Sequence, residues 1–240
     1  MLIPLEPEMI FNDSENEMMK ENKTKINEIR FKFQQAINDN IQAQIIDGKG
    51  LQTHSLLNDT SKQAEFDLKK IYANLNYGKS ENPDFNNQKK KPFYIKIKEK
   101  INKKIDDDSA NTEEIGIVKD KPSENYINVT FRNNKILQEM NEKYNTDYFV
   151  FINQLELKTN YESCLDRSIN LFKRDYDLHY SVYDATGKQV AGGISSIHVN
   201  KSSNDLNDII QKYIPKLVDN VKMGLNGAKP LKLSQSGIQP

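Results

Sequence analysis

Three stretches decide the fold: Tyr148–Leu157 (YFVFINQLEL), Asp177–Asp184 (DLHYSVYD) and Lys188–Val199 (KQVAGGISSIHV). In each of them polar and apolar residues alternate, which is the pattern of a β-strand with one buried face. Ala185-Thr186-Gly187 separates the second stretch from the third and has the composition of a tight hairpin loop. The segment from Asp147 to Val199 is therefore predicted to be an antiparallel three-strand meander.

Helices are expected on the N-terminal side of the meander. Apolar residues recur every three or four positions in residues 22–46, 60–75 and 133–144, which indicates three amphipathic helices. A capping box of Thr60 and Gln63 is predicted to begin the second helix, and Asn133 or Asn134 to cap the third. Gly48 and Gly50 are predicted to end the first helix, and Asn76-Tyr77-Gly78 the second.

Shorter apolar patterns predict further strands. Leu2-Ile3-Pro4-Leu5 resembles a first strand, Leu51–Leu57 fits a short one, and Ile127, Val129 and Phe131 alternate. The segment from Lys79 to Glu124 is rich in Asn, Pro, Lys and Asp, and we interpret it as a linker or a loop-rich insertion.

A last helix is expected after the meander, capped by Ser202 or Ser203. Its apolar face comprises Leu206, Ile209, Tyr213, Leu217 and Val221. Pro215 lies inside this pattern and cannot donate a backbone hydrogen bond, so we predict a kink or a break there, at a cost of about 3 kcal/mol. Residues 226–240 are predicted to form a flexible C-terminal tail. The apolar periodicity of the helix stops after Gly224, just before this tail.

These elements predict an α+β fold in which helices pack on one mixed sheet, with the C-terminal meander followed by a helix. We expect one α/β domain over residues 1–225, with 79–124 as its insertion.

Composition gives few functional clues. The 34 basic and 34 acidic residues cancel, so there is no global field that would attract nucleic acid or an anionic membrane. Purely apolar runs are too short to span a bilayer, and no signal segment follows Met1. The lone Cys164 excludes an internal disulfide and fits a cytosolic protein or a disulfide-free envelope protein equally well.

The histidines suggest one catalytic hypothesis. His179, Ser181 and Asp177 are spaced to share one face of a strand, and His198 belongs to what we expect to be the neighbouring strand. A serine beside a histidine could act as a nucleophile in a hydrolase. The same pattern is typical of a solvated polar sheet face, which is the interpretation we favour. His54 is the third histidine.

Other motifs have simpler structural interpretations. Cys164 lacks a recognisable nucleophile signature and reads as a small apolar filler. Gly192-Gly193 indicates a bulge or a close approach of another backbone. The acidic residues from Glu6 to Glu17 lack the glycine and the final glutamate of a calcium loop, so we expect a solvated loop. The basic stretch Lys89–Lys104 contains only two aromatics and favours a surface loop over a nucleic-acid site. We expect no metal and no cofactor.

Two segments carry a resemblance to a known family. Lys143-Tyr144-Asn145-Thr146-Asp147-Tyr148-Phe149-Val150-Phe151 passes from a helix through a short turn into an aromatic-aliphatic strand. Tyr183-Asp184-Ala185-Thr186-Gly187-Lys188-Gln189-Val190 forms a hairpin before a terminal helix. With the opening strand, this layout resembles the TolB N-terminal-like fold and the CsgG-like envelope lipoproteins of curli secretion.

The resemblance implies a periplasmic or outer-membrane-associated protein that docks to other envelope proteins without catalysis. Any membrane attachment would be through a lipid anchor outside this chain. We therefore expect a non-enzymatic protein-interaction module. A hydrolase or small-ligand-binding protein that uses His179, Ser181 and Asp177 is the alternative, and a cytoplasmic location is the alternative to the envelope.

Overall fold

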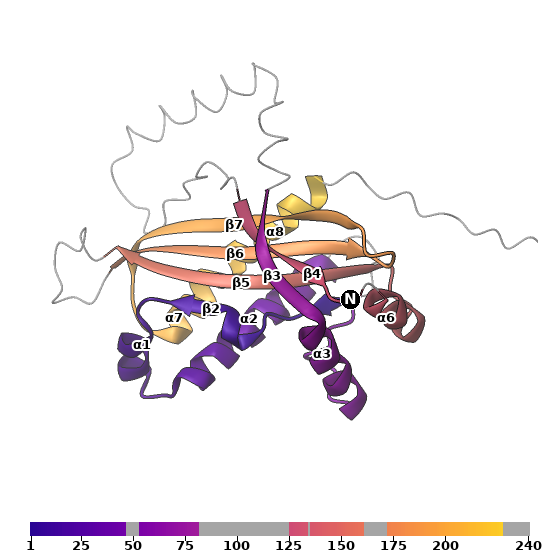
Figure 1. Ribbon diagram of the computed structural model, residues 1–240. Coiled ribbons are helices and arrows are strands. Elements are labelled where there is room, and N and C mark those ends of the chain that lie inside the picture. Colours follow the sequence, from indigo (N-terminus) through magenta and orange to yellow (C-terminus); the bar gives the residue numbers. More distant parts are fainter. Residues whose placement is uncertain (47–52, 82–124, 134, 161–171, 228–240) are drawn as a thin grey trace, which may run out of the picture.

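The computed structural model describes residues 1–46, 53–81, 125–133, 135–160 and 172–227 (Figure 1). It has the predicted α+β architecture, a mixed sheet with helices packed on it. The three strands of the meander are β5 (Tyr148–Asn160), β6 (Phe172–Asp184) and β7 (Gln189–Ser202). The meander prediction is confirmed, and each strand is longer than its sequence pattern indicated.

The main sheet has the order β1-β5-β6-β7, with β2 also paired to β5. β6 is antiparallel to both of its neighbours, from Tyr148 opposite Asp184 to Phe172 opposite Ser202. Gly187 has a φ of 83° in the β6–β7 turn, a conformation that glycine adopts without steric cost. The Asp184 side chain accepts hydrogen bonds from the backbone N–H groups of Thr186 and Lys188, which closes the predicted hairpin.

Two short strands complete the β5 edge. β1 (Leu2–Ile3) and β2 (Ile10–Asn12) both run parallel to β5, and the 3-10 helix η1 (Pro7–Met9) lies between them. The predicted strand at Leu2–Leu5 is therefore real but shorter, because Pro4 cannot donate to a sheet ladder. A strand as short as β2 has no detectable period-two pattern, so it was not predicted.

A separate two-stranded sheet crosses one face of the meander (Figure 1). It is an antiparallel pair of β3 (Leu75–Glu81) and β4 (Asn125–Phe131), with Leu75 opposite Phe131 and Glu81 opposite Asn125. β4 was predicted, but β3 was not. Asn76-Tyr77-Gly78 lies inside β3 and is not a turn, and Lys79–Glu81 is strand and not insertion; the rest of that insertion lies outside the described residues.

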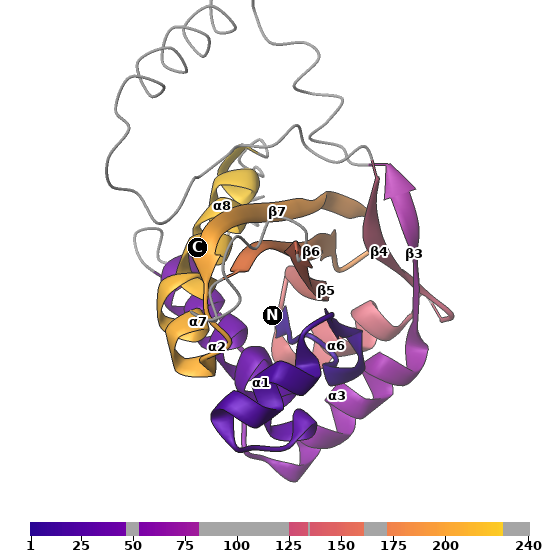
Figure 2. The ribbon, with the colours of Figure 1, turned by 90° about the vertical axis from the view of Figure 1, so that its left-hand side faces the viewer.

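The main sheet separates two hydrophobic cores, and Figure 2 shows the layers on either side of it. On one face lie α1 (Glu15–Asn22), α2 (Ile26–Ile46), α7 (Leu206–Lys212) and α8 (Ile214–Gly227). On the other face lie the β3–β4 hairpin, α3 (Lys62–Asn74) and α6 (Ile136–Tyr144). Alternate β6 residues supply the two cores, with Leu178 and Tyr180 in the first and Tyr183 in the second.

Several predicted helix starts need correction. Ser61, and not Thr60, caps α3, because its hydroxyl accepts the N–H of Ala64 at 3.1 Å. The N-cap of α6 is Lys135, which makes no side-chain capping bond, so the predicted cap at Asn133 or Asn134 is wrong; Asn133 instead accepts the N–H of Lys135 ahead of the helix. The acidic segment Glu6–Glu17, expected as a loop, contains η1, β2 and the start of α1.

The expected strand at Leu51–Leu57 is also wrong where it is described. Residues 53–57 contain a single parallel bridge, between Ser55 and Leu2, followed by a turn.

The expected last helix divides into two. α7 begins after Asp205, whose side chain accepts the N–H groups of Asn207 and Asp208, so neither Ser202 nor Ser203 is the cap. The helices separate at Tyr213, two residues before Pro215, which confirms the predicted break. α8 continues to Gly227, two residues into the predicted tail, and 228–240 lie outside the described residues.

Arg174 joins four parts of the fold at one end of β6. Its side chain is fully buried, and in the described structure its partners are all neutral oxygens. Nε donates to Thr159, one terminal nitrogen to Ser202 and the Ser203 carbonyl, and the other to Ser14 and Asn204. The guanidinium thus links the start of α1, the end of β5 and the connection from β7 to α7.

We predict that Arg174→Met destabilises the chain by about 3 kcal/mol, because it leaves several buried oxygens without donors. Arg174→Lys should also destabilise it, because an ammonium has three donors in place of five and cannot span the same acceptors. Chemical denaturation measures both effects. The matched control is Arg132→Met, since Arg132 is exposed; an equal loss in both Met variants would contradict the assigned role.

Candidate functional site

The predicted catalytic residues do share one face of β6, but the β3–β4 hairpin covers part of that face. Asp177 is half-buried at the open part, His179 is 5% exposed and Ser181 is 0% exposed. Our interpretation of these residues as a solvated polar sheet face is therefore correct for Asp177 only.

His179 is a hydrogen-bond partner of the hairpin backbone. Its Nδ1 accepts the N–H of Ile127 in β4 at 3.0 Å. In a neutral ring this leaves the proton on Nε2, which is buried and lies 3.5 Å from the nearer Glu156 carboxylate oxygen, outside normal hydrogen-bond length. The lone pair that a metal or a catalytic base would need is already used by Ile127.

Ser181 is hydrogen-bonded to Asn153 and not to His179. Its hydroxyl lies 3.1 Å from Asn153 Nδ2, and the same Nδ2 donates to the carbonyl of Ile127 at 2.8 Å. Asn153 occupies the irregularity in the β5–β6 register, between Ile152 and Gln154. Among the described residues His179 and Ser181 share no hydrogen bond, so this geometry does not prepare Ser181 as a nucleophile.

His179 and Asn153 together bind both backbone polar groups of Ile127. Tyr183 extends the contact, because its hydroxyl lies 2.5 Å from the carbonyl oxygen of Val129. We call His179, Asn153 and Tyr183 the hairpin clamp. Its chemistry is that of a docking surface for β4, since buried backbone groups away from a ladder need side-chain partners.

A polar depression of about 460 Å³ lies beside the clamp. It is lined by residues of both sheets, and its carboxylates are Glu156, Asp175 and Asp177. Each has an internal partner: Lys158 binds Glu156 and lies 3.3 Å from Asp177, Ser196 donates to Asp177 at 2.5 Å, and His198 binds Asp175. Each of these carboxylates thus already has a hydrogen-bond or ion-pair partner within the fold.

The electrostatics of the depression centre on Glu156. The imidazole of His179, 3.5 Å away, and the Lys158 ammonium lower the pKa of the Glu156 carboxyl to about 2, against the opposing effect of burial. Glu156 is therefore ionised at neutral pH and is not a proton donor for general acid catalysis.

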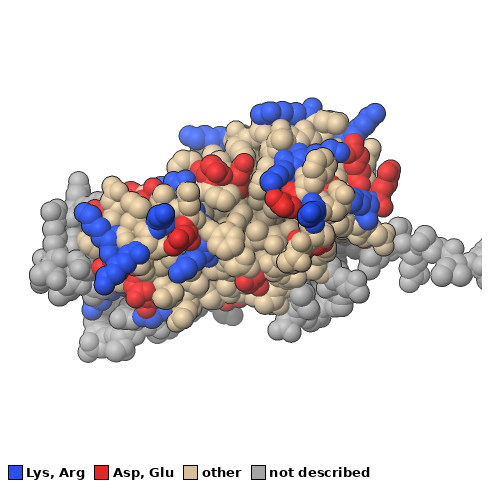
Figure 3. Space-filling view, turned by 90° about the horizontal axis from the view of Figure 1, so that it is seen from below, with Lys and Arg blue, Asp and Glu red and all other residues tan. Residues whose placement is uncertain are grey.

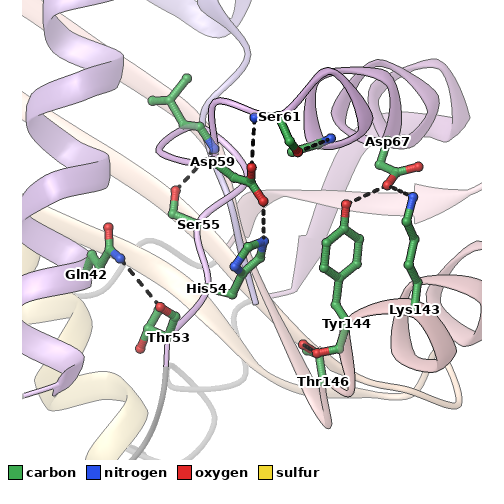
Figure 4. A network of polar contacts seen from close by, with 12 residues as sticks. Gln42, Thr53, His54, Ser55, Asp59, Ser61, Asp67, Lys143, Tyr144 and Thr146 are labelled. Carbon is green, nitrogen blue, oxygen red and sulfur yellow. Dashed lines mark hydrogen bonds and ion pairs between the residues drawn. The ribbon is translucent and has the colours of Figure 1, made fainter.

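His54 lies in a different network, between α3 and α6 (Figure 4). Its ring stacks on Tyr144 with centroids 5.1 Å apart, and its Nε2 is 3.4 Å from Asp59. The buried carboxylate of Asp67 in α3 accepts from the Tyr144 hydroxyl at 2.6 Å and binds Lys143. The bonds of Asp67 to Tyr144 and Lys143 hold α6 against α3.

The predicted close approach of another backbone is wrong at Gly192 in β7, because the neighbouring atoms are those of side chains. A Cβ at this position would lie 2.7 Å from the hydroxyl of Tyr126 in β4 and 2.6 Å from Gln189 Nε2. Gln189 also hydrogen-bonds Tyr126 and Asn128, so this contact is the second attachment of the hairpin to the meander.

The outer edge of β7 is the other candidate site. β7 is the last strand in the sheet order, and no described strand pairs with its far side. It has 14 residues, and between Gln189 and Asn200 it contains no Asp, Glu, Lys, Arg or Pro. Natural edge strands are usually short or protected by charge or proline. The opposite edge follows that rule, with β1 and β2 of two and three residues.

One face of the described structure carries charges of both signs. Basic and acidic side chains are interspersed over the face in Figure 3, in agreement with the zero formal charge. No helix in the described residues has the length and apolarity needed to cross a bilayer. The described part of the chain also holds no cluster of three or more potential metal ligands. Cys164 and Lys89–Lys104 lie outside the described residues.

Comparisons with known protein families, with curated proteins and with solved structures find no match to this chain.

We predict that Gly192→Ala destabilises the chain by about 1 kcal/mol or more, because the new methyl group overlaps Tyr126. Combination with Tyr126→Phe should recover part of the loss, and a double-mutant cycle by denaturation measures that coupling. Gly78→Ala is the control, since a Cβ there meets nothing within 4 Å. Strictly additive effects of the Gly192 and Tyr126 changes would refute the contact.

We also predict an acid-dependent contribution from Glu156. Because its pKa is lowered in the folded state, its stabilisation is complete above the ordinary value of 4.5 and is lost as the pH falls to about 2. The difference in unfolding free energy between wild type and Glu156→Gln should shrink over that range, by about 1 kcal/mol because solvent screens this partly exposed group. Denaturation at a series of pH values tests this; exposed Glu142→Gln is the control. A difference that does not vary with pH would disprove it.

Proposed function

We propose that this chain is a non-enzymatic protein-interaction module of the cell envelope, which docks to another protein by adding a strand to the β7 edge. The observation that carries the proposal is the length of that edge combined with its lack of protecting charges. A long strand at the end of a sheet is the kind of element to which a partner adds a strand in β-augmentation.

The envelope location rests on the resemblance of Lys143–Phe151 and Tyr183–Val190 to TolB N-terminal-like and CsgG-like proteins. Other envelope proteins are accordingly the partners we propose. The absence of catalysis is supported by the hairpin clamp, because His179 and Ser181 are occupied in holding β4.

The test is recovery of cross-linked partners from the envelope fraction of cells that express the chain. Ile194→Lys places a charge in the middle of the β7 edge and should reduce recovery several-fold, since a charged edge disfavours pairing. Phe11→Lys is the matched control, an apolar-to-Lys change on the opposite edge, where Phe11 is 52% exposed. Circular dichroism verifies that both variants fold.

Equal recovery by both variants would show that the partner binds elsewhere. A chain that recovers no partner but hydrolyses a substrate, with turnover abolished in His179→Gln, would replace the proposal by the hydrolase alternative.

A further inference from the structure

We propose that His179 makes the attachment of the β3–β4 hairpin to the main sheet sensitive to acid. Protonation of its imidazole releases the N–H of Ile127 and, with it, residues 125–127 at the start of β4. The inference does not depend on the β7 edge, because it concerns the contact between β4 and β6.

The bond between Ile127 and His179 requires a neutral ring. The backbone N–H of Ile127 donates to Nδ1 of His179 at 3.0 Å. A ring nitrogen that accepts a hydrogen bond carries no proton, so the proton of the neutral ring is on Nε2. In an imidazolium both nitrogens carry hydrogen, and the N–H of Ile127 would then face an N–H group. Protonation of His179 and docking of Ile127 therefore exclude one another.

The hairpin itself offers Ile127 no replacement for this bond. Ile127 lies opposite Lys79 in the β3–β4 pair, but its N–H donates to His179 and its carbonyl accepts from Asn153 at 2.8 Å. Both polar groups thus point at the main sheet and away from the ladder with β3. An N–H that loses its acceptor there has to reach water, so the start of β4 must move away from β6.

The released hairpin leaves a protonated His179 with partners for both of its N–H groups. Nε2 lies 3.5 Å from a carboxylate oxygen of Glu156, which is ionised at neutral pH. Once Ile127 has left, the Nδ1–H group is open to water. Because an imidazolium is a donor at both nitrogens, acid favours the released state over the docked one.

The other charged groups beside His179 act in the same direction or are already paired. The described residues with ionisable side chains that line the depression with His179 come from β3, β4, β5 and β6: Lys79, Tyr126, Glu156, Lys158, Asp175 and Asp177. Lys158 binds Glu156 and His198 of β7 binds Asp175, while the Tyr126 hydroxyl is hydrogen-bonded to Gln189. Lys79 is exposed and belongs to the hairpin, so its repulsion from an imidazolium adds to the release.

The other end of the hairpin is held without an imidazole. The hydroxyl of Tyr183 lies 2.5 Å from the carbonyl oxygen of Val129, and both Leu75 and Val129 are buried in the second core. The hairpin therefore opens from residues 125–127 and does not leave the sheet as a whole.

Hydrogen exchange of the Ile127 amide tests the inference. Its rate in the unmodified chain is measured by NMR between about pH 8 and about pH 5, where imidazoles change charge. Each rate is divided into the rate of a free amide at the same pH, which gives a protection factor. Protection of Ile127 should fall by up to about tenfold per pH unit as the ring becomes charged, and protection of Leu178 in β6 should change much less. The nitrogen chemical shifts of the His179 ring report its charge in the same samples.

Two variants separate His179 from the other histidines. His179→Asn keeps a side-chain oxygen as an acceptor near the position of Nδ1 and cannot take up a proton, so protection of Ile127 should become independent of pH. His198→Asn is the matched control, because it removes a half-buried imidazole from the neighbouring strand. The control should retain the pH dependence of the unmodified chain.

Three results would overturn the inference. The first is an Ile127 amide that stays protected while the His179 ring becomes charged, and the second is a ring that stays neutral with Ile127 protected throughout. The third is an equal pH dependence in His179→Asn and the unmodified chain. If His179→Asn does not fold, the unmodified chain alone decides, since ring charge and loss of Ile127 protection must change together.

Discussion

The position of β6 is the constraint on which the rest of the structure depends. It pairs with β5 and β7 along nearly all of its length, and its alternate residues enter two different cores. Helices α1, α2, α7 and α8 need one face of this strand, and the hairpin with α3 and α6 needs the other. Arg174 links the first of these layers to the ends of all three meander strands through neutral acceptors alone. A buried cation in this setting is tolerable because every side of the guanidinium is hydrogen-bonded.

The layer formed by β3, β4, α3 and α6 explains why His179, Ser181 and Asp177 resemble a catalytic set. A strand whose face was entirely apolar could not hold β4, because the N–H and C=O of Ile127 point at the sheet and need partners. His179 and Asn153 supply them, and Ser181 fills the space beside Asn153 with a group that can share its hydrogen bonds. Polar residues on a strand thus serve here to dock a second sheet, and their proximity to Asp177 creates no reactive pair.

The parts of the fold that local periodicity encodes could be predicted. The meander, the α2, α3 and α6 helices and the break before Pro215 all depend on residues within a few positions of one another. β3 could not be found, because its partner β4 begins 44 residues after it ends and Gly78 looks like a turn residue. α1 was missed since its sequence is mostly polar and only Met18 is fully buried.

The same difference between local patterns and long-range contacts applies to the candidate sites. The His179–Asn153–Ile127 contacts and the five bonds of Arg174 join segments far apart in the chain, so no spacing rule reveals them. The alternation of β7 and its lack of charge could be predicted from the sequence. Its place at the end of the sheet order could not, because that depends on the pairing of β1 and β2 with β5 at the other edge.

The central claim is that β6 is the protected centre of the sheet, and backbone amide hydrogen exchange tests it most directly. The account predicts that β6 amides exchange only through global unfolding, while amides of the β3–β4 pair exchange faster. β6 amides that exchange as fast as those of β3 and β4 would contradict it.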